Sequence, residues 1–583
     1  MSESISLPFT GEYNPQPMTT NFEDFLNTNY GVIGRTVSTK FEPNTSSEFQ
    51  FWLSKINFRG NDNSETENKI APIEIGNIVA AYSDQNDEIT FGIVTEMRSY
   101  SDVESFIADY LSHDFGDATI EVPTDISEVI VVTCAVMRNV SLKTKPVGRS
   151  RVYFPSILGI QFAYGIVDEH GNIIYKGASI PFGVFENGDN TVAPISVDED
   201  FLLGPESAHL NVSGISGLAS KTSAIEFVIK SVLTHSRKRI AVVMFNVKSK
   251  DLLYIDQPNL ELEGEEWSMR AYETLQIPAQ PFENSRFFAP TDPTNRPNGT
   301  KSLRELPTTN FEWDLQMIAH QIPSLFDSID WDDRMEGVWF VIQDEIDRGT
   351  FITYAQMLTW IDNQINQATN RQQQLIRGGH TATWNKMRFH LHRIPRSYEG
   401  LIATAGQGRD IPWNELTSGN VFVIDIQKLN DRGQRLVFGR SISTLSRKLE
   451  NNELALDSVI VFVDELNKFA PSGGSSSPLK ARLIDITARG RGLGLILFGA
   501  EQFASSVDKE IVENSSTYLY GRTETNELRS PNFSAFSDEV KTKLTMLPQG
   551  QLLIKFAKFP QPIFLKFPFP PCLPGDKYPT NNE

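Results

Sequence analysis

Four runs that are apolar at nearly every position constrain the fold of this chain more than any other feature of its sequence. They cover 240–245, 421–426, 459–463 and 493–498, and stretches with a helical pattern lie between most of them. A strand that is apolar at nearly every position is buried on both faces, and such strands alternating with helices are typical of a parallel α/β sheet. We therefore predict an α/β fold for the part of the chain after residue 200.

The part of the chain before residue 200 has a different pattern. Short β-rich runs over 75–82, 89–97 and 129–137 are separated by turn-forming residues. Short strands at this spacing are typical of a small antiparallel barrel or sandwich. We predict an N-terminal β-barrel over 29–200. Before it, residues 1–28 are polar and rich in Pro and Asn, and we expect a flexible arm there.

The remaining segments complete the predicted domain organisation. The α/β core is expected to consist of 201–258 and 416–559, interrupted by a largely helical insertion over 259–415. Within the insertion, 354–375 has a clear helical pattern. Residues 560–583 are rich in proline, which has no backbone N–H and is excluded from helix interiors and central strands. We expect this end of the chain to be an extended strap or tail.

The composition excludes some classes of function. The chain has 53 Lys and Arg against 73 Asp and Glu, a net charge of −20, which excludes a protein that binds nucleic acid through overall positive charge. Two cysteines, Cys134 and Cys572, are too few for a disulfide framework or a Cys-rich zinc site, so a reducing compartment is expected. We see no signal peptide, and no apolar run reaches about 18 residues. We therefore expect a cytoplasmic protein that does not span a membrane.

A glycine-rich segment, Gly-Ile-Ser-Gly-Leu-Ala-Ser-Lys-Thr over 214–222, lies between a short apolar run and a helical pattern. This order is typical of a phosphate-binding loop, in which backbone N–H groups and the helix N-terminus surround the phosphates. The lysine neutralises phosphate oxygens and the threonine hydroxyl can bind Mg²⁺. Its glycines lie seven and four residues before the lysine, where the usual motif has them six and one before it, so an ordinary turn is the alternative. The candidate nucleotide-binding residues are Gly214, Gly217, Ser220, Lys221, Thr222 and Ser223.

Two acidic residues end the apolar run 459–463. Asp464 and Glu465 follow it directly, and a carboxylate at the end of a buried strand is costly unless it has a partner. Asp464 could bind Mg²⁺ and Glu465 could polarise an attacking water molecule. The alternative is a strand that simply runs into a surface loop.

The segment 488–502 combines two arginines, an apolar run and a polar end. Gln502 follows the run 493–498, and ligands bind at this edge of such sheets, so Gln502 could contact a γ-phosphate or a water molecule. Arg489 or Arg491, placed at a subunit interface, could stabilise charge in a neighbouring site. The alternative is a solvated arginine pair before a core strand.

One region is basic although the chain is acidic. Residues 363–398 contain no Asp or Glu, and they include the candidate DNA-binding residues Arg377, Lys386, Arg388 and Arg393. A local basic surface is what binding to the phosphate backbone requires. The alternative is that these residues pair with acidic parts of the same protein. His390 and His392 lack further ligands nearby in sequence, so we expect no metal there.

Together, these segments resemble a HerA-type hexameric P-loop ATPase of the HerA/FtsK branch, in its bacterial variety. The resemblance covers about 70–570 and follows the order of barrel, glycine-rich loop, helical insertion, Asp-Glu strand, arginine-rich segment and proline-rich tail. It implies a RecA-like parallel-sheet P-loop core with a small N-terminal β-barrel and a helical insertion. The segment 246–251 departs from the family, because it reads Asn-Val-Lys-Ser-Lys-Asp where many relatives have an Asp-Pro-His-Gly type of turn.

The resemblance also implies roles for the candidate residues. ATP and Mg²⁺ would be the cofactors, with Lys221 on the phosphates and Thr222 and Asp464 on Mg²⁺. Glu465 would be the general base and Gln502 the sensor. Arg489 or Arg491 would act on a neighbouring subunit, and nothing in the sequence chooses between them.

The implied function is an ATP-hydrolysing double-stranded DNA translocase or helicase-like motor that acts as a homohexameric ring. Its partner would be a separate nuclease or sirtuin-like NADase effector, in DNA end processing or antiphage defence. The alternative is a nucleotide-binding ring scaffold that assembles and gates an effector with little translocation. A third hypothesis, an α/β enzyme unrelated to nucleotides, predicts that no nucleotide binds.

Overall fold

The chain forms two compact units in the computed structural model. One unit contains residues up to Ile174 together with Glu186–Ala193, and the other contains Tyr175–Phe185 and the chain from Pro194 onward. The structure describes residues 22–57, 68–101, 103–112, 128–217, 221–326, 331–473 and 477–578.

The first unit is a closed antiparallel barrel, which confirms the predicted barrel. Its strands follow the closed order β1 (Val32–Val37), β2 (Glu48–Leu53), β7 (Glu128–Asn139), β6 (Glu88–Ser101), β5 (Ile78–Ser83) and β8 (Arg151–Tyr153). Side chains of a strand point alternately to its two faces, and in β2 Phe49 and Phe51 are buried while their neighbours are not. The alternation therefore places one side of each strand in the barrel core. Outside it lie β3 (Lys55–Asn57), β4 (Asn68–Ile70), α1 (Phe106–Ser112) and α2 (Ile157–Ala163).

The end of the predicted flexible arm is part of the barrel unit. Phe25, in a short 3-10 helix over Phe22–Phe25, is fully buried. Its ring lies edge-on to that of Phe162 in α2, with centroids 5.1 Å apart, and 6.1 Å from that of Phe91. The prediction of an arm over 1–28 is therefore wrong for 22–28, because one aromatic side chain anchors this polar segment. Residues 1–21 lie outside the described part.

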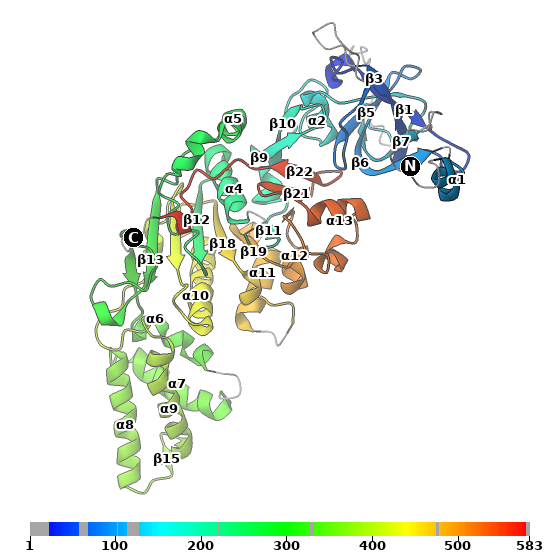
Figure 1. Cartoon of the computed structure of the whole chain (residues 1–583). Coiled ribbons are helices and arrows are strands. Elements are labelled where there is room, and N and C mark those ends of the chain that lie inside the picture. Colours follow the sequence, from blue (N-terminus) through cyan, green and yellow to red (C-terminus); the bar gives the residue numbers. More distant parts are fainter. Residues whose placement is uncertain are drawn as a thin grey trace, which may run out of the picture. The chain divides into compact units, whose positions relative to one another are not determined.

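The second unit is built on one large mixed sheet (Figure 1). The strand order is β10 (Val192–Asp198), β9 (Ser179–Glu186), β22 (Ile563–Lys566), β21 (Gln551–Phe556), β20 (Thr517–Tyr520), β11 (Leu210–Ser213), β19 (Leu495–Glu501), β18 (Ser458–Asp464), β12 (Ile240–Asn246), β17 (Val421–Asp425), β13 (Ser285–Pro290) and β14 (Thr309–Phe311). The strands predicted from the four apolar runs, β12, β17, β18 and β19, are neighbours and parallel. Every residue of these strands is buried, as their uniformly apolar sequences predict.

Three features of this sheet differ from the predicted organisation. Strands β9 and β10 lie within 29–200 but belong to the large sheet, and β13 and β14 come from the segment predicted as a helical insertion. Strand β22 is a central strand between β9 and β21, although its segment was predicted to be excluded from central strands. The prolines flank β22 without interrupting it, so its four backbone N–H groups are intact. Beyond β22 the chain is extended: the Leu573 N–H donates to Gln257 O over 2.9 Å.

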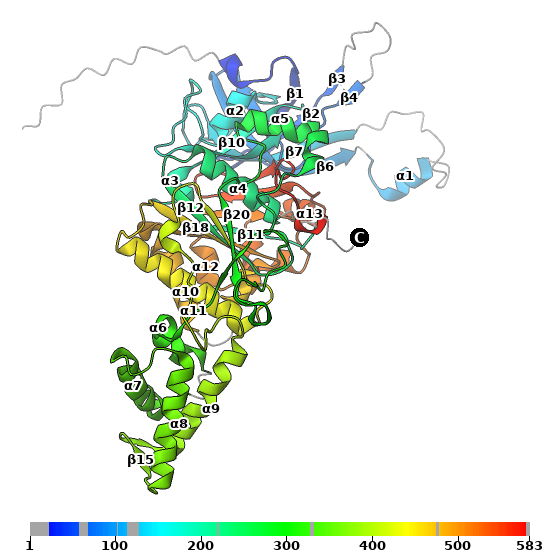
Figure 2. The same cartoon turned by 90° about the vertical axis from the view of Figure 1, so that its left-hand side faces the viewer.

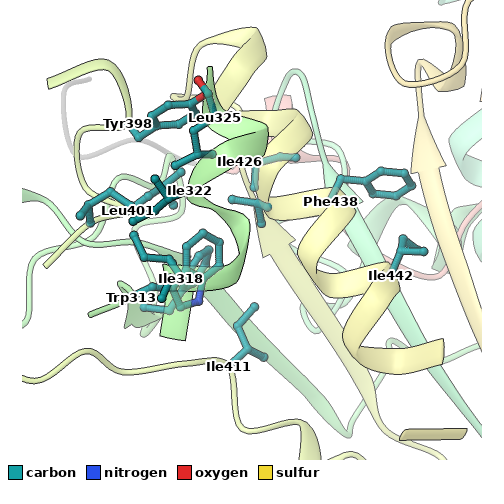
Figure 3. Packing of buried hydrophobic residues seen from close by; sticks show 14 of the residues in the cluster. Trp313, Ile318, Ile322, Leu325, Tyr398, Leu401, Ile411, Ile426, Phe438 and Ile442 are labelled. Atoms are coloured by element: carbon teal, nitrogen blue, oxygen red, sulfur yellow. The ribbon is translucent and has the colours of Figure 1, made fainter. Parts of the chain in front are cut away.

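Helices connect the parallel strands. Helix α4 (Lys221–His235) follows β11, α10 (Asp431–Glu450) follows β17, and α11 (Pro478–Leu493) precedes β19. Buried residues recur along α10 at helical spacing, and the Phe438 ring contacts that of Phe245 in β12 edge-on at 4.9 Å. Figure 3 shows Phe438 and Ile442 of α10 pointing into this core. This unit also contains α3 (Glu199–Leu202), α5 (Glu266–Leu275), α12 (Lys509–Glu513) and α13 (Asp538–Thr545).

The helical part of the predicted insertion is a compact group that begins at α6 (Leu315–Ile318). It continues with α7 (Asp333–Asp347), α8 (Tyr354–Asn370) and α9 (Thr381–Ser397), with the small hairpin of β15 (Leu375–Ile376) and β16 (Gly379–His380) between α8 and α9. Helices α7, α8 and α9 lie side by side (Figures 1 and 2). Across the described residues, no helix has the length and apolarity needed to cross a membrane.

Candidate nucleotide-binding site

The carboxyl ends of four parallel strands bring the predicted phosphate loop and the acidic pair to one edge of the sheet. Strand β11 leads into the loop and β18 ends at Asp464, with β19 between them. Gly217 has φ +78°, a conformation that favours glycine. Its carbonyl accepts a hydrogen bond from Gln549 Nε2 at 2.5 Å. Ser220 lies outside the described residues.

Lys221 is the first residue of α4 and is almost fully buried. Its Nζ donates to Gly214 O over 2.7 Å, across the loop that connects β11 to α4. Burial lowers the pKa of Lys221, and the nearby carboxylates, Asp464 first among them, oppose this effect. The structure therefore places a buried cation at the start of a helix, where the helix dipole also attracts anions.

Asp464 and Glu465 turn sharply away from the sheet. Glu465 has φ +58°, a left-handed conformation that is uncommon for a residue with a side chain, and its N–H donates to Asp464 Oδ1 over 2.9 Å. Such strain occurs where the surrounding structure holds it, often at functional sites. The turn fixes the Asp464 carboxylate at the sheet edge and leaves the Glu465 side chain partly exposed.

A lysine that was not among the predicted site residues contacts both acids. Lys248 Nζ lies 3.0 Å from Glu465 Oε1 and 3.5 Å from Asp464 Oδ2. Burial lowers its pKa, but the two carboxylates outweigh burial, so the pKa of Lys248 is raised. The signal in the sequence was a lysine three residues after the end of the apolar run 240–245, since parallel strands bring such residues to the same edge.

Glu501, which also was not predicted, is the most deeply buried acid of this edge. It ends β19, pairs in register with Ser213 of β11 and is fully buried. Asn211 lies beside it, but within the described part of the chain neither carboxylate oxygen has a hydrogen-bond partner of good geometry. Burial raises the pKa of Glu501 well above its ordinary value, while Lys221 opposes the shift. The predicted sensor Gln502, one residue later, is exposed.

A cavity of about 790 Å³ opens beside these groups. Lys221, Thr222 and Asp464 line it together, and so do Gly217 and Ser223. Residues from α5 and from the extended segment after β22 also line the cavity, and most of them are apolar: Trp267, Pro568, Phe569, Pro570 and Cys572. This volume is in the range of small-molecule sites, which combine apolar walls with a few polar groups.

The groups around the cavity fit a nucleoside triphosphate with Mg²⁺. A buried lysine and a helix N-terminus are the groups that bind phosphates, and the Thr222 hydroxyl and the Asp464 carboxylate are oxygen ligands of the kind Mg²⁺ prefers. Asp425 offers a contrast at the end of β17, which β12 separates from β18. Its carboxylate accepts hydrogen bonds from Asn246 Nδ2 at 3.0 Å, Ser302 Oγ at 2.7 Å and the Leu303 N–H at 3.1 Å, so its partners are already in the fold.

The structure does not bring the predicted arginines to this site within one chain. Arg489 and Arg491 belong to the last turns of α11, which leads into β19. They lie at the amino end of β19, about 20 Å from its carboxyl end at the usual rise per residue. Arg489 is exposed and donates from Nε to Asp485 Oδ1 in the same helix at 2.6 Å, and Arg491 Nη1 donates to Glu206 O at 2.7 Å.

The predicted DNA-binding residues divide into two groups. Arg377 Nη1 lies 2.5 Å from Glu345 of α7, and Arg388 Nη1 lies 3.8 Å from Asp362 of α8. These two therefore pair with acids of the same helical group, as the alternative hypothesis expected. Arg393 is exposed on α9 beside the Phe389 ring, and Lys386 is half-buried on the same helix. Trp384, which the sequence placed among them, is fully buried.

Comparisons with known proteins give weak likenesses. No family model matches the chain, and no curated protein matches it. The solved structure of VirB4 of Thermoanaerobacter pseudethanolicus is 14% identical over 68% of this chain and 97% of that one, with a TM-score of 0.41. The bacterial conjugative coupling protein TrwB is 12% identical over 64% of this chain and 87% of that one, with a TM-score of 0.40. The genome packaging NTPase B204 from Sulfolobus turreted icosahedral virus 2, in complex with ATP-gammaS, is 18% identical over 26% of this chain and 68% of that one. Its TM-score is 0.21. At these scores the likenesses carry no functional argument.

Proposed function

We propose that this protein binds and hydrolyses ATP in the cavity beside Lys221. Lys221 would neutralise the phosphates, with the backbone of Gly214, Gly217 and Ser220 and the side chain of Ser223 around them. Thr222 and Asp464 would hold Mg²⁺, which when bound withdraws charge from the phosphates. Glu465 would orient the attacking water molecule and accept its proton.

One observation carries this proposal. Lys221 and Thr222 come from one segment of the chain and Asp464 from another, yet all three line the same cavity. An ordinary turn at a helix start would give no reason for a buried lysine to lie near a strand-end acid. The cation, the hydroxyl and the carboxylate are together the set that phosphoryl transfer requires.

We further propose that hydrolysis drives a DNA motor of the HerA type, which acts as a homohexameric ring. The resemblance in motif order supports this, as do two arginines far from the site of their own chain, where a neighbouring copy could use them. Exposed Arg393 and half-buried Lys386 on α9 are the best candidates for phosphate-backbone contacts. A separate nuclease or sirtuin-like effector, in DNA end processing or antiphage defence, would be the partner.

A second function has its own supporting observations. Lys248 contacts Glu465, and Lys468 Nζ also lies 3.7 Å from Glu465 Oε2. A general base held by two lysines is less available to a water molecule, and the loop glycines are shifted from the usual spacing. The chain could then be a nucleotide-binding scaffold that gates an effector and hydrolyses ATP slowly.

ATP hydrolysis with and without double-stranded DNA tests these functions. We expect ATP turnover that DNA stimulates. The Lys221→Ala variant should bind nucleotide much more weakly, because it loses the buried charge at the start of α4. The Glu465→Gln variant should bind ATP but hydrolyse it at least about 100-fold more slowly, since it lacks the general base.

The outcomes separate the hypotheses. A slow rate that is the same with and without DNA would support the scaffold over the motor. A wild-type protein that binds no nucleotide would contradict both. As a control, Asp425→Asn should leave the catalytic parameters of the folded protein nearly unchanged, because this acid is bonded within the fold.

A further inference from the structure

Lys248 occupies a position that the fold determines closely. It lies in the turn that follows β12, and β12 pairs in register with β18, with Phe245 opposite Val463. Buried Asn246 closes this turn, because its Nδ2 donates to Ser249 O over 3.1 Å. The same Nδ2 also donates to Asp425. The turn therefore directs Lys248 toward the acidic pair.

The Lys248 side chain lines the same cavity as Lys221 and Thr222. This side chain is 29% exposed, so a ligand in the cavity can reach its ammonium group. Lys221 and Lys248 are also close enough for their charges to repel each other. Two cations thus approach one cavity, from α4 and from the turn after β12.

The contacts of Lys248 with the acids depend on what the cavity contains. A Mg²⁺ ion at Asp464 would repel the ammonium group that now lies 3.5 Å from this carboxylate. A triphosphate would at the same time bring several negative charges beside it. A lysine is a flexible point charge with three donors, so it can move from a carboxylate to a phosphate without a change in the backbone.

We propose that Lys248 is a second triphosphate-binding cation, which contacts the terminal phosphate and is held by Asp464 and Glu465 until the nucleotide binds. This inference rests on the proposed nucleotide site. Lys248 lines the cavity with Asp464 and contacts Glu465, and the water-activating group of the proposed mechanism must lie next to the terminal phosphate. The same movement would release Glu465 from the ion pair.

The proposal predicts which nucleotides Lys248 distinguishes. ADP lacks the phosphate that Lys248 would contact, so Lys248→Met should weaken binding of a non-hydrolysable ATP analogue about 10-fold or more and change ADP binding much less. Lys248→Arg keeps the charge and should retain most of the preference. Lys221→Ala should instead weaken the binding of both nucleotides, because Lys221 at the loop would contact the inner phosphates as well.

Calorimetric titration of the wild type and variants with ADP and with the analogue, both with Mg²⁺, tests this. The readout is the ratio of the two Kd values, which a partly unfolded sample does not change. Lys250→Met is the matched control, since Lys250 is in the same turn but does not line the cavity. It should leave the ratio at the wild-type value.

A Lys248→Met ratio equal to that of the wild type would overturn the proposal and leave nucleotide binding intact. If hydrolysis were also faster in this variant, the role of the lysine would be to restrain Glu465. If the wild type binds neither nucleotide, the proposed function fails, and this inference fails with it.

Discussion

At the scale of single residues, acids at strand ends look alike in sequence and differ in their partners. Asp425 accepts hydrogen bonds from several donors of the fold, Asp464 lines the cavity and contacts a lysine, and Glu501 is buried without a well-placed hydrogen-bond partner among the residues that the structure describes. A buried polar group costs free energy unless it is satisfied. The number of partners that the fold supplies therefore separates a structural acid from one that is available for a ligand.

Glu226 on α4 gives a prediction at this scale. It is almost fully buried and lines the cavity, and burial, with Asp251 nearby, raises its pKa to about 8. Because the folded pKa lies above the ordinary value of 4.5, its contribution to stability is complete below about pH 4.5 and is lost as the pH rises toward 8. In the Glu226→Gln variant this loss, up to about 1.4 kcal/mol per pH unit, should disappear.

Urea unfolding of both proteins between pH 5 and pH 8.5 measures this difference. The stability of Glu226→Gln relative to the wild type should increase with pH up to about 8 and then stay constant. Asp251 and Cys572, which also interact with Glu226, are present in both proteins and largely cancel. Parallel stability curves would show that Glu226 is ionised in the folded protein at neutral pH.

At the scale of elements, the glycines of the arginine-rich segment end a helix and begin a strand. Gly494 caps α11 with φ +74°, and its N–H donates to Gly490 O. A Cβ there would lie 2.3 Å from Asp457 O. Gly492, two residues earlier in the same helix, has open space around its Cα. One glycine is therefore required by the turn into β19, and the other is not.

The two positions form a matched pair of substitutions. Gly494→Ala should lower the free energy of unfolding by more than about 1 kcal/mol, because alanine strains the left-handed cap and collides with the backbone at Asp457. Gly492→Ala should raise it by up to about 1 kcal/mol, because alanine favours the helix. Denaturant unfolding measures both effects, and equal effects at the two positions would contradict this account of the turn.

At the scale of the whole molecule, a complete site requires a second copy if the distant arginines are catalytic. Arg489 and Arg491 lie near the amino end of β19, whereas the cavity of their own chain lies near its carboxyl end. A trans-acting arginine in phosphoryl transfer contributes about 1000-fold or more to kcat. Removing the correct arginine should therefore abolish turnover without affecting the site of the same chain.

Mixing of inactive variants tests this at the level of assembly. Arg489→Ala or Arg491→Ala, mixed with Glu465→Gln, should regain hydrolysis, because the Glu465→Gln copy supplies the arginine to an intact neighbouring site. The arginine whose variant is rescued is the one that acts in trans. A mixture of Lys221→Ala with Glu465→Gln is the control, since both changes damage the cavity itself. No regain with either arginine variant would show that neither acts in trans.

Much of the architecture follows from local sequence patterns. The nearly continuous apolarity of β12, β17, β18 and β19 predicted a parallel sheet, because strands buried on both faces need apolar residues at almost every position. Short β-rich runs separated by turn-forming residues predicted the barrel. The glycine-rich segment before a helix led to Lys221 and Thr222 as candidates, and the acid at the end of an apolar run led to Asp464. Local patterns missed β22, whose four residues are too few to show a pattern between prolines.

Only the tertiary structure decided which side chains meet. Lys248 and Glu501 follow apolar runs just as Asp464 does, but whether they share its edge depends on strand order, which local patterns do not encode. The pairing of Arg377 with Glu345 and of Arg388 with Asp362 likewise depends on how α7, α8 and α9 pack. Periodicity records whether a residue is buried. The identity of its neighbours arises from contacts between segments far apart in the chain, and these exist only after folding.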